Sequence, residues 1–92
     1  SNIMNMRVKE GGSMMENKRK VVIITGAAQG IGRAVAQEYV KKGYQVVIAD
    51  VKEATDLQDM LCIQTDVRNP ADIDNLIEQT VHTYGRIDIL IF

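Results

Sequence analysis

Residues 21–32 read Val-Val-Ile-Ile-Thr-Gly-Ala-Ala-Gln-Gly-Ile-Gly, and they carry the strongest signal for the architecture of the chain. Its first half is a β-branched run, which is typical of a strand buried on both faces of a parallel sheet. Its second half is rich in glycine, which permits a tight turn and a close approach of the backbone to a bound group. Apolar residues then recur at helical spacing, at Ile31, Ala34, Val35 and Tyr39. The stretch therefore predicts a strand, a glycine-rich turn and a helix in direct succession.

The rest of the chain repeats this alternation of strand and helix. Residues 45–50 and 60–65 are short apolar runs that predict a second and a third strand. Residues 69–85 begin with Asn-Pro, a helix N-cap followed by a first-turn proline, and end with a helix-stopping glycine. Residues 87–92, Ile-Asp-Ile-Leu-Ile-Phe, predict a fourth strand. This pattern favours an α/β fold, with a parallel sheet of order 3-2-1-4 and helices on both faces.

Size, charge and cysteine content limit the class of protein. The chain has 92 residues, of which 46% are apolar and 25% are charged, as expected for one small globular domain. A net charge of −1 gives no reason to expect nucleic acid or a membrane as a partner. The single cysteine, Cys62, cannot form an intrachain disulfide and fits a reducing compartment. We therefore expect a cytoplasmic protein, and no metal site is predicted.

Residues 1–14 are interpreted as a leader that is either flexible or derived from an expression vector. The first two residues resemble the remnant of a protease cleavage. Met4, Met6 and Val8 alternate with polar residues, which is the period of a strand with one apolar face. The flexible leader is the favoured interpretation, because chain termini are commonly disordered. Residues 15–92 are then the folded domain.

A phosphate-binding turn is predicted where the first strand meets the first helix. Gly26 allows the chain to reverse, and Gly30 and Gly32 leave room for phosphate oxygens beside the start of the helix. The N–H groups of the first helical turn and the helix dipole both favour an anion at that place. A glycine-rich turn alone is a weak signal. Here a buried strand precedes it, a helix follows it, and an acid ends the next strand.

That acid is Asp50, at the end of the second predicted strand. A carboxylate there accepts hydrogen bonds from both hydroxyls of an adenosine ribose, each contributing about 1.5–3 kcal/mol. A 2′-phosphate in the same place is repelled by roughly 1–4 kcal/mol at a separation of about 4 Å. Neither Gln29 nor Val51 is basic, and Lys52 is the one neighbouring residue that softens the preference. The sequence therefore predicts that NAD binds in preference to NADP.

Asp66 follows the third predicted strand and opens on the same edge of the sheet as Asp50. Its carboxylate is suited to accept a hydrogen bond from the amino group of an adenine. It is equally suited to cap the loop that leads into the helix beginning near Asn69. The residues alone leave both roles open.

Residues 20–92 resemble the short-chain dehydrogenases/reductases. Residues 25–32 are similar to the cofactor motif of that family, and residues 85–91 are similar to its approach to the fourth strand. Asp50 is similar to the acid that selects NAD, and Asp66 with Val67 is similar to the adenine contact. The resemblance implies a Rossmann-like domain of which this chain holds the N-terminal half, truncated after the fourth strand.

The resemblance also implies an activity and a set of site residues. The activity is NAD(P)-dependent oxidation of an alcohol or reduction of a carbonyl on a small-molecule substrate. Gln29 and Ile31 would contact the cofactor through their backbones. The implied cofactor-binding residues are Gly26, Gln29, Gly30, Ile31, Gly32, Asp50, Asp66 and Val67.

The catalytic residues of that family have no counterpart in this chain. The family uses a serine and a tyrosine that is followed four residues later by a lysine. Tyr39, Tyr44 and Tyr84 are the tyrosines here, and none has lysine at the fourth following position. Hydride transfer also needs a proton donor for the developing alkoxide. We therefore expect no catalytic residue, and a chain that binds the cofactor without turnover.

Two other classes of protein remain open. One is a methyltransferase-type site for S-adenosylmethionine, although Thr25 stands where such sites commonly have an acid. The other is a non-catalytic module that associates with itself, because the fourth predicted strand would leave an open sheet edge. Such an edge, or the alternating segment 4–8, makes a homo-oligomer the expected state.

Overall fold

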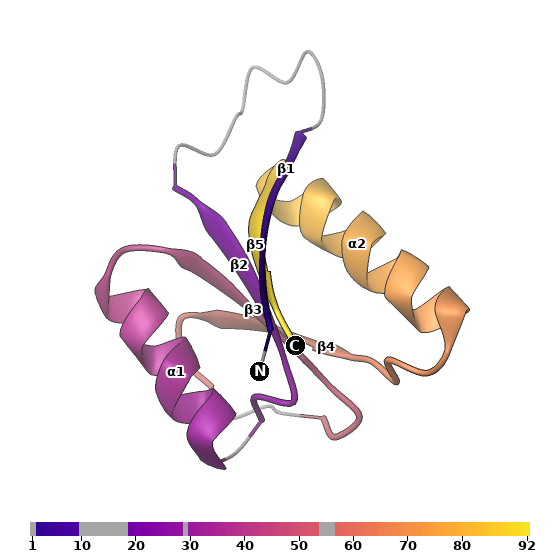
Figure 1. The fold of residues 1–92 in the computed structure, drawn as a ribbon, viewed down its shortest axis with the longest axis horizontal. Coiled ribbons are helices and arrows are strands. Elements are labelled where there is room, and N and C mark those ends of the chain that lie inside the picture. Colours follow the sequence, from indigo (N-terminus) through magenta and orange to yellow (C-terminus); the bar gives the residue numbers. More distant parts are fainter. Residues whose placement is uncertain (1, 10–18, 29, 54–56) are drawn as a thin grey trace.

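The computed structural model describes residues 2–9, 19–28, 30–53 and 57–92. These residues form a five-stranded sheet with two helices, shown in Figure 1. The strands are β1 (Ile3–Lys9), β2 (Val21–Thr25), β3 (Gln45–Asp50), β4 (Met60–Gln64) and β5 (Arg86–Ile91). The helices are α1 (Gly30–Lys41) and α2 (Pro70–Tyr84). The predicted strands and helices from residue 21 onward are therefore present, within a residue or two at their ends.

The order of strands in the sheet is β1-β5-β2-β3-β4. Strands β5, β2, β3 and β4 run parallel to one another, and their order is the predicted 3-2-1-4. The difference from the prediction is β1, which pairs antiparallel with β5 and makes the sheet mixed. The α/β class holds, but the expected purely parallel sheet does not.

Strand β1 changes the expectation of a flexible leader for residues 3–9 and the expectation of an open sheet edge, while residues 10–14 of the predicted leader lie outside the described residues. Residues 3–9 are not a flexible leader but a strand, with Ile3 opposite Ile91 and Met4 opposite Leu90. The alternation of apolar and polar residues was the correct signal. Because β1 covers β5, the edge that was expected to stand open for a partner is occupied within the chain itself.

Two cores lie on opposite faces of the sheet because successive strand residues point to opposite sides. On one face Leu76 of α2 packs with Val21, Ile23 and Val47, and on the other Ala36 of α1 packs with Val22. The separation of α1 and α2 by the sheet can be followed in Figure 1. The β2 and β3 runs are buried nearly throughout, as a strand covered by helices on both faces requires.

The ends of α2 follow the predicted signals. Asn69 is the N-cap, and its side-chain oxygen accepts a hydrogen bond from the N–H of Ala71 at 3.0 Å. Gly85 ends the helix in the left-handed conformation, with φ of 78°, and its N–H donates to the carbonyl of Val81. In the described part of the chain, no helix is long and apolar enough to cross a membrane.

The expected apolar face of α1 is partly wrong. Ile31 is 86% exposed and Ala34 is also exposed, whereas Ala36 is fully buried. Ile31 lies in the first turn, where the helix has only just left the sheet edge, so it has no core to face. The side chain of Ile31 is therefore free for contacts outside the core.

Candidate functional site

The glycine-rich turn lies at the carboxyl end of β2 and has the conformation that its sequence predicts. Gly26 and Gly30 have φ values of 68° and 71°, in the region that side chains other than glycine rarely adopt. The N–H of Gly26 donates to the carbonyl of Ala49 at 2.8 Å, which ties the turn to β3. Gln29 lies outside the described residues, so its predicted contact stays a prediction.

Gly32 brings helix α1 against the turn. A Cβ at this position would lie 2.8 Å from the carbonyl oxygen of Gly26 and 2.9 Å from the Cα of Ala27. Both neighbours are backbone atoms, so a side chain cannot be accommodated by a change of rotamer. At Gly26 and Gly30, by contrast, a Cβ would meet nothing within 4 Å. The turn is therefore packed closely on its inner side and open on its outer side.

Asp50 joins the turn to the end of β3. Its Oδ2 accepts a hydrogen bond from the N–H of Ala28 at 3.1 Å, and its Oδ1 accepts one from the N–H of Lys52, also at 3.1 Å. An ionised carboxylate has about four acceptor positions, so both oxygens keep capacity for further donors. The carboxylate is thus held in place beside the glycine-rich turn and can still receive two hydroxyl groups.

A hollow of about 250 Å³ lies between the turn and the ends of β3 and β4. Asp50 is one wall of it, and Val51 and Val67 are apolar walls that are each 55% exposed. The complete lining consists of Thr25, Gly26, Ala49, Asp50, Val51, Thr65 and Val67. The structure therefore brings together three of the predicted site residues, Gly26, Asp50 and Val67, at the ends of β2, β3 and β4.

Ala49, Thr65 and the apolar role of Val51 were not predicted from the sequence. Thr65 is buried, and its hydroxyl donates to the carbonyl of Ile63 at 2.9 Å. A signal for these residues exists, since each lies next to an acid at the end of a parallel strand. Only the folded arrangement shows which of these neighbours line the hollow.

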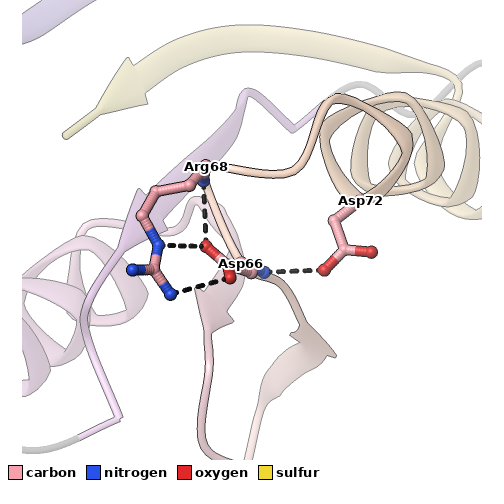
Figure 2. A network of polar contacts seen from close by, with 3 residues as sticks. All are labelled: Asp66, Arg68 and Asp72. Carbon is pink, nitrogen blue, oxygen red and sulfur yellow. Dashed lines mark hydrogen bonds and ion pairs between the residues drawn. The ribbon is translucent and has the colours of Figure 1, made fainter.

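Asp66 is held by Arg68, as Figure 2 shows. The Oδ1 atom of Asp66 accepts from the backbone N–H of Arg68 at 2.9 Å and from its Nε at 3.0 Å. The Oδ2 atom accepts from Nη2 of Arg68 at 3.1 Å. These side-chain and backbone hydrogen bonds lower the pKa of Asp66. The carboxylate therefore caps its own loop, which is the second of the two roles that the sequence left open.

A second hollow, of about 530 Å³, lies beside the first and shares Val51 with it. Asp66 and Arg68 line it together with Gln64 and Asp72. Ligand sites in proteins commonly measure about 300–1,000 Å³, so the two adjoining hollows have the size of a nucleoside site. They lie at the carboxyl ends of the strands, where open α/β sheets bind ligands.

The residues present fit the adenosine and pyrophosphate parts of a dinucleotide. The turn is open outward where phosphates would lie, Asp50 has free acceptor positions, and apolar walls flank the hollow. Within the described ranges no three histidine, cysteine or acidic side chains are grouped so as to hold a metal ion.

Comparison with known proteins places the chain in a family. A family model described as short chain dehydrogenase matches residues 20–92. L-fucose dehydrogenase of Oryctolagus cuniculus is 40% identical over 78 residues, covering 78% of this chain and 28% of that protein. Tropinone reductase-like 1 of Erythroxylum coca is 44% identical over 78 residues, covering 77% of this chain and 29% of that protein.

A solved structure agrees with these relatives. The 3-ketoacyl-(acyl-carrier-protein) reductase from Brucella melitensis, complexed with NADH, superposes with a TM-score of 0.69 at 31% identity. The match covers 74% of this chain and 31% of that one. The chain belongs to the short-chain dehydrogenase family, and its relatives are named as oxidoreductases. It spans about a third or less of the length of the curated relatives that it matches.

Proposed function

We propose that this chain is the cofactor-binding part of an NAD-preferring short-chain oxidoreductase that acts on a small alcohol or carbonyl compound. The observation that carries the proposal is the carboxylate of Asp50, which Ala28 and Lys52 fix beside the glycine-rich turn. A carboxylate held there is placed to accept hydrogen bonds from the 2′- and 3′-hydroxyls of an adenosine ribose. When bound, the nicotinamide cofactor would supply hydride transfer.

The remaining residues divide between the pyrophosphate and the adenine. Backbone N–H groups of residues 26–32, with Gln29 and Ile31 among them, would face the pyrophosphate at the N-terminus of α1. Asp66 would accept a hydrogen bond from the adenine amino group, and Val67 would flank the ring in the smaller hollow. The conformations of Gly26 and Gly30 support this division, since neither position has any atom where a Cβ would stand.

The preference for NAD rests on charge. A 2′-phosphate beside Asp50 would meet a fixed negative charge, at a cost of roughly 1–4 kcal/mol at about 4 Å. Val51, the next residue, is apolar and exposed, so it offers no compensating charge. Lys52 binds Asp50 through its backbone N–H, and its exposed side chain is the one nearby cation in residues 50–53.

Titration of the 92-residue chain with NADH and NADPH tests this proposal. Binding is followed by the fluorescence of the reduced nicotinamide, to which the chain adds no tryptophan emission. The melting temperature is a second, independent measure of binding. We expect NADH to bind about ten-fold more tightly, and Asp50→Asn to reduce the ratio to within about three-fold, because it removes the repelling charge.

The matched control is Asp74→Asn, which makes the same change of charge at an exposed position of α2. It should leave the ratio unchanged. Equal affinity of the unmodified chain for the two cofactors would overturn the assignment of Asp50. Binding of S-adenosylmethionine without binding of either dinucleotide would favour the methyltransferase class instead.

A further inference from the structure

The pair formed by Asp66 and Arg68 has an unusual geometry for an exposed ion pair. The side chain of Arg68 is 86% exposed and that of Asp66 is 34% exposed. Three N–H groups of Arg68 nevertheless reach the carboxylate within 2.9–3.1 Å, one from the backbone and two from the guanidinium. Exposed pairs with a single contact contribute little to stability. A planar two-point contact instead fixes the orientation of the carboxylate.

The contacts also fix how many donors the carboxylate can still accept. Of about four acceptor positions, the two on Oδ1 are taken by the backbone N–H and Nε, and one on Oδ2 is taken by Nη2. One position remains, on Oδ2. The backbone of Asp66 is fixed as well, because its N–H donates to Oδ2 of Asp72 at 2.8 Å at the start of α2 (Figure 2).

The Asp66–Arg68 pair lies in the wall of a hollow that is large enough to hold a ligand. Asp66 and Arg68 both line the larger hollow, which shares Val51 with the hollow beside Asp50. A ligand that extends from Asp50 over Val51 would therefore enter the hollow that Asp66 lines. The group that fits one remaining carboxylate acceptor is a single N–H donor. A carbonyl oxygen at the same place would face a negative charge.

We propose that Arg68 is a positioning residue that makes the site selective for a purine with an exocyclic amino group. By holding Asp66, it fixes the one remaining acceptor for the amino group of adenine, while the charge of that fixed carboxylate disfavours the carbonyl of hypoxanthine. The inference rests on the proposed dinucleotide site and adds to it the residue that sets base selectivity. Arg68 itself need not touch the ligand.

The test compares NADH with its hypoxanthine analogue, reduced nicotinamide hypoxanthine dinucleotide. We expect the unmodified chain to bind NADH about ten-fold more tightly, as a hydrogen bond to a charged group implies. Arg68→Ala should reduce that ratio to within about three-fold, because the carboxylate then turns freely. Arg68→Lys keeps the charge but loses the two-point contact, so it should give an intermediate ratio.

Two controls separate selectivity from stability. Lys41→Ala removes a cation from another exposed ion pair, with Glu38 at 3.4 Å near the far end of α1, and should leave the ratio unchanged. Asp66→Ala should abolish the selectivity, and adding Arg68→Ala to it should then have no further effect.

The outcomes distinguish this inference from the proposed function. If Arg68→Ala lowers the affinities for NADH and for the hypoxanthine analogue equally, or changes only the melting temperature, the pair only stabilises the loop and the inference is wrong. A selectivity that survives in Asp66→Ala would also overturn it. If the unmodified chain binds neither dinucleotide, the proposed function itself fails, and the base-selectivity assignment fails with it.

Discussion

Gly32 shows how strictly a single position in the turn is determined. The backbone of Gly26 and Ala27 leaves no room for a Cβ there, because both atoms would lie within 3 Å of it. We expect Gly32→Ala to lower the free energy of unfolding by about 1–3 kcal/mol, as overpacking does. Thermal or urea unfolding measures the change. Gln37→Ala, at an exposed position of the same helix, should have little effect, and an equal loss in both variants would contradict the steric explanation.

Asp88 links the starts of β5 and β2, away from the proposed ligand edge. Its carboxylate accepts from Nε of Arg86 at 2.8 Å, from Nη2 of Arg86 at 2.6 Å, and from the N–H of Val21 at 2.8 Å. Burial opposes ionisation of this carboxyl, but the hydrogen bonds from Arg86 and Val21 and the charges of Arg86 and Lys20 outweigh it. Together they lower the pKa of Asp88.

A lowered pKa in the folded state gives Asp88 a defined pH dependence. Its contribution to stability is complete above the pKa of the unfolded chain and is lost as the pH falls through the pKa of the folded state. Asp88→Asn should therefore destabilise the chain by about 3 kcal/mol at pH 7, as loss of one member of a buried ion pair does. The difference in free energy of unfolding between Asp88→Asn and the unmodified chain should become smaller under acid conditions. Urea unfolding across the acid range measures it, and a constant difference would refute this account.

The positions predicted from the sequence agree best with the structure for residues that directly follow a buried strand. Asp50 was predictable because a strand that is buried on both faces must end where the polar residue begins. The hold of Arg68 on Asp66 was not predictable, since it depends on the path of a loop and on one rotamer. Thr80 is buried in α2 because its hydroxyl donates to the carbonyl of Leu76 at 2.7 Å, a contact that hydrophobic periodicity does not register.

At the scale of elements, β1 is where sequence reasoning erred. The alternation of Met4 and Met6 with polar residues predicted a strand, but the general disorder of termini outweighed it. Residues 3–9 become a strand because of a long-range contact. The edge of β5 has unpaired backbone groups, and pairing with β1 supplies their hydrogen-bond partners. Met6 and Leu90 also pack against the core on the α2 face. Local propensity could not reveal an edge that forms only after the other strands assemble.

Removal of residues 1–9 tests the role of β1. The β5 edge would then be exposed, so we expect concentration-dependent association in sedimentation velocity. Stability should fall by about 1–3 kcal/mol, because each cross-strand pair contributes about 0.2–1 kcal/mol. Arg7→Ala, at an exposed position of β1, keeps the strand and should match the unmodified chain. A shortened chain that stays monomeric with an unchanged melting temperature would show that β1 neither shields the edge of β5 from association nor stabilises the fold.

At the scale of the whole molecule, none of the three tyrosines lines the two hollows beside Asp50 and Asp66. Tyr84 is in α2, and burial raises the pKa of its hydroxyl, which is the opposite of what an acid catalyst needs. Tyr39, in the last turns of α1, packs edge to face against Tyr44 just after the helix, with ring centroids 4.9 Å apart. We therefore expect this chain to bind NADH without oxidising it in the presence of small carbonyl compounds. Absorbance at the reduced nicotinamide band measures this, and steady turnover would contradict it.

The pairing of β1 with β5 also places the two described ends of the chain side by side. Asn2 and Phe92 exchange two backbone hydrogen bonds, at 2.5 and 2.9 Å. A force that pulls these ends apart would act on the β1–β5 ladder from its open end and break its hydrogen bonds one after another. The parallel strands in the interior would carry load only after β1 had detached. Under tension, β1 is therefore the first element to separate, and the proposed dinucleotide site at the ends of β2, β3 and β4 is protected until it does.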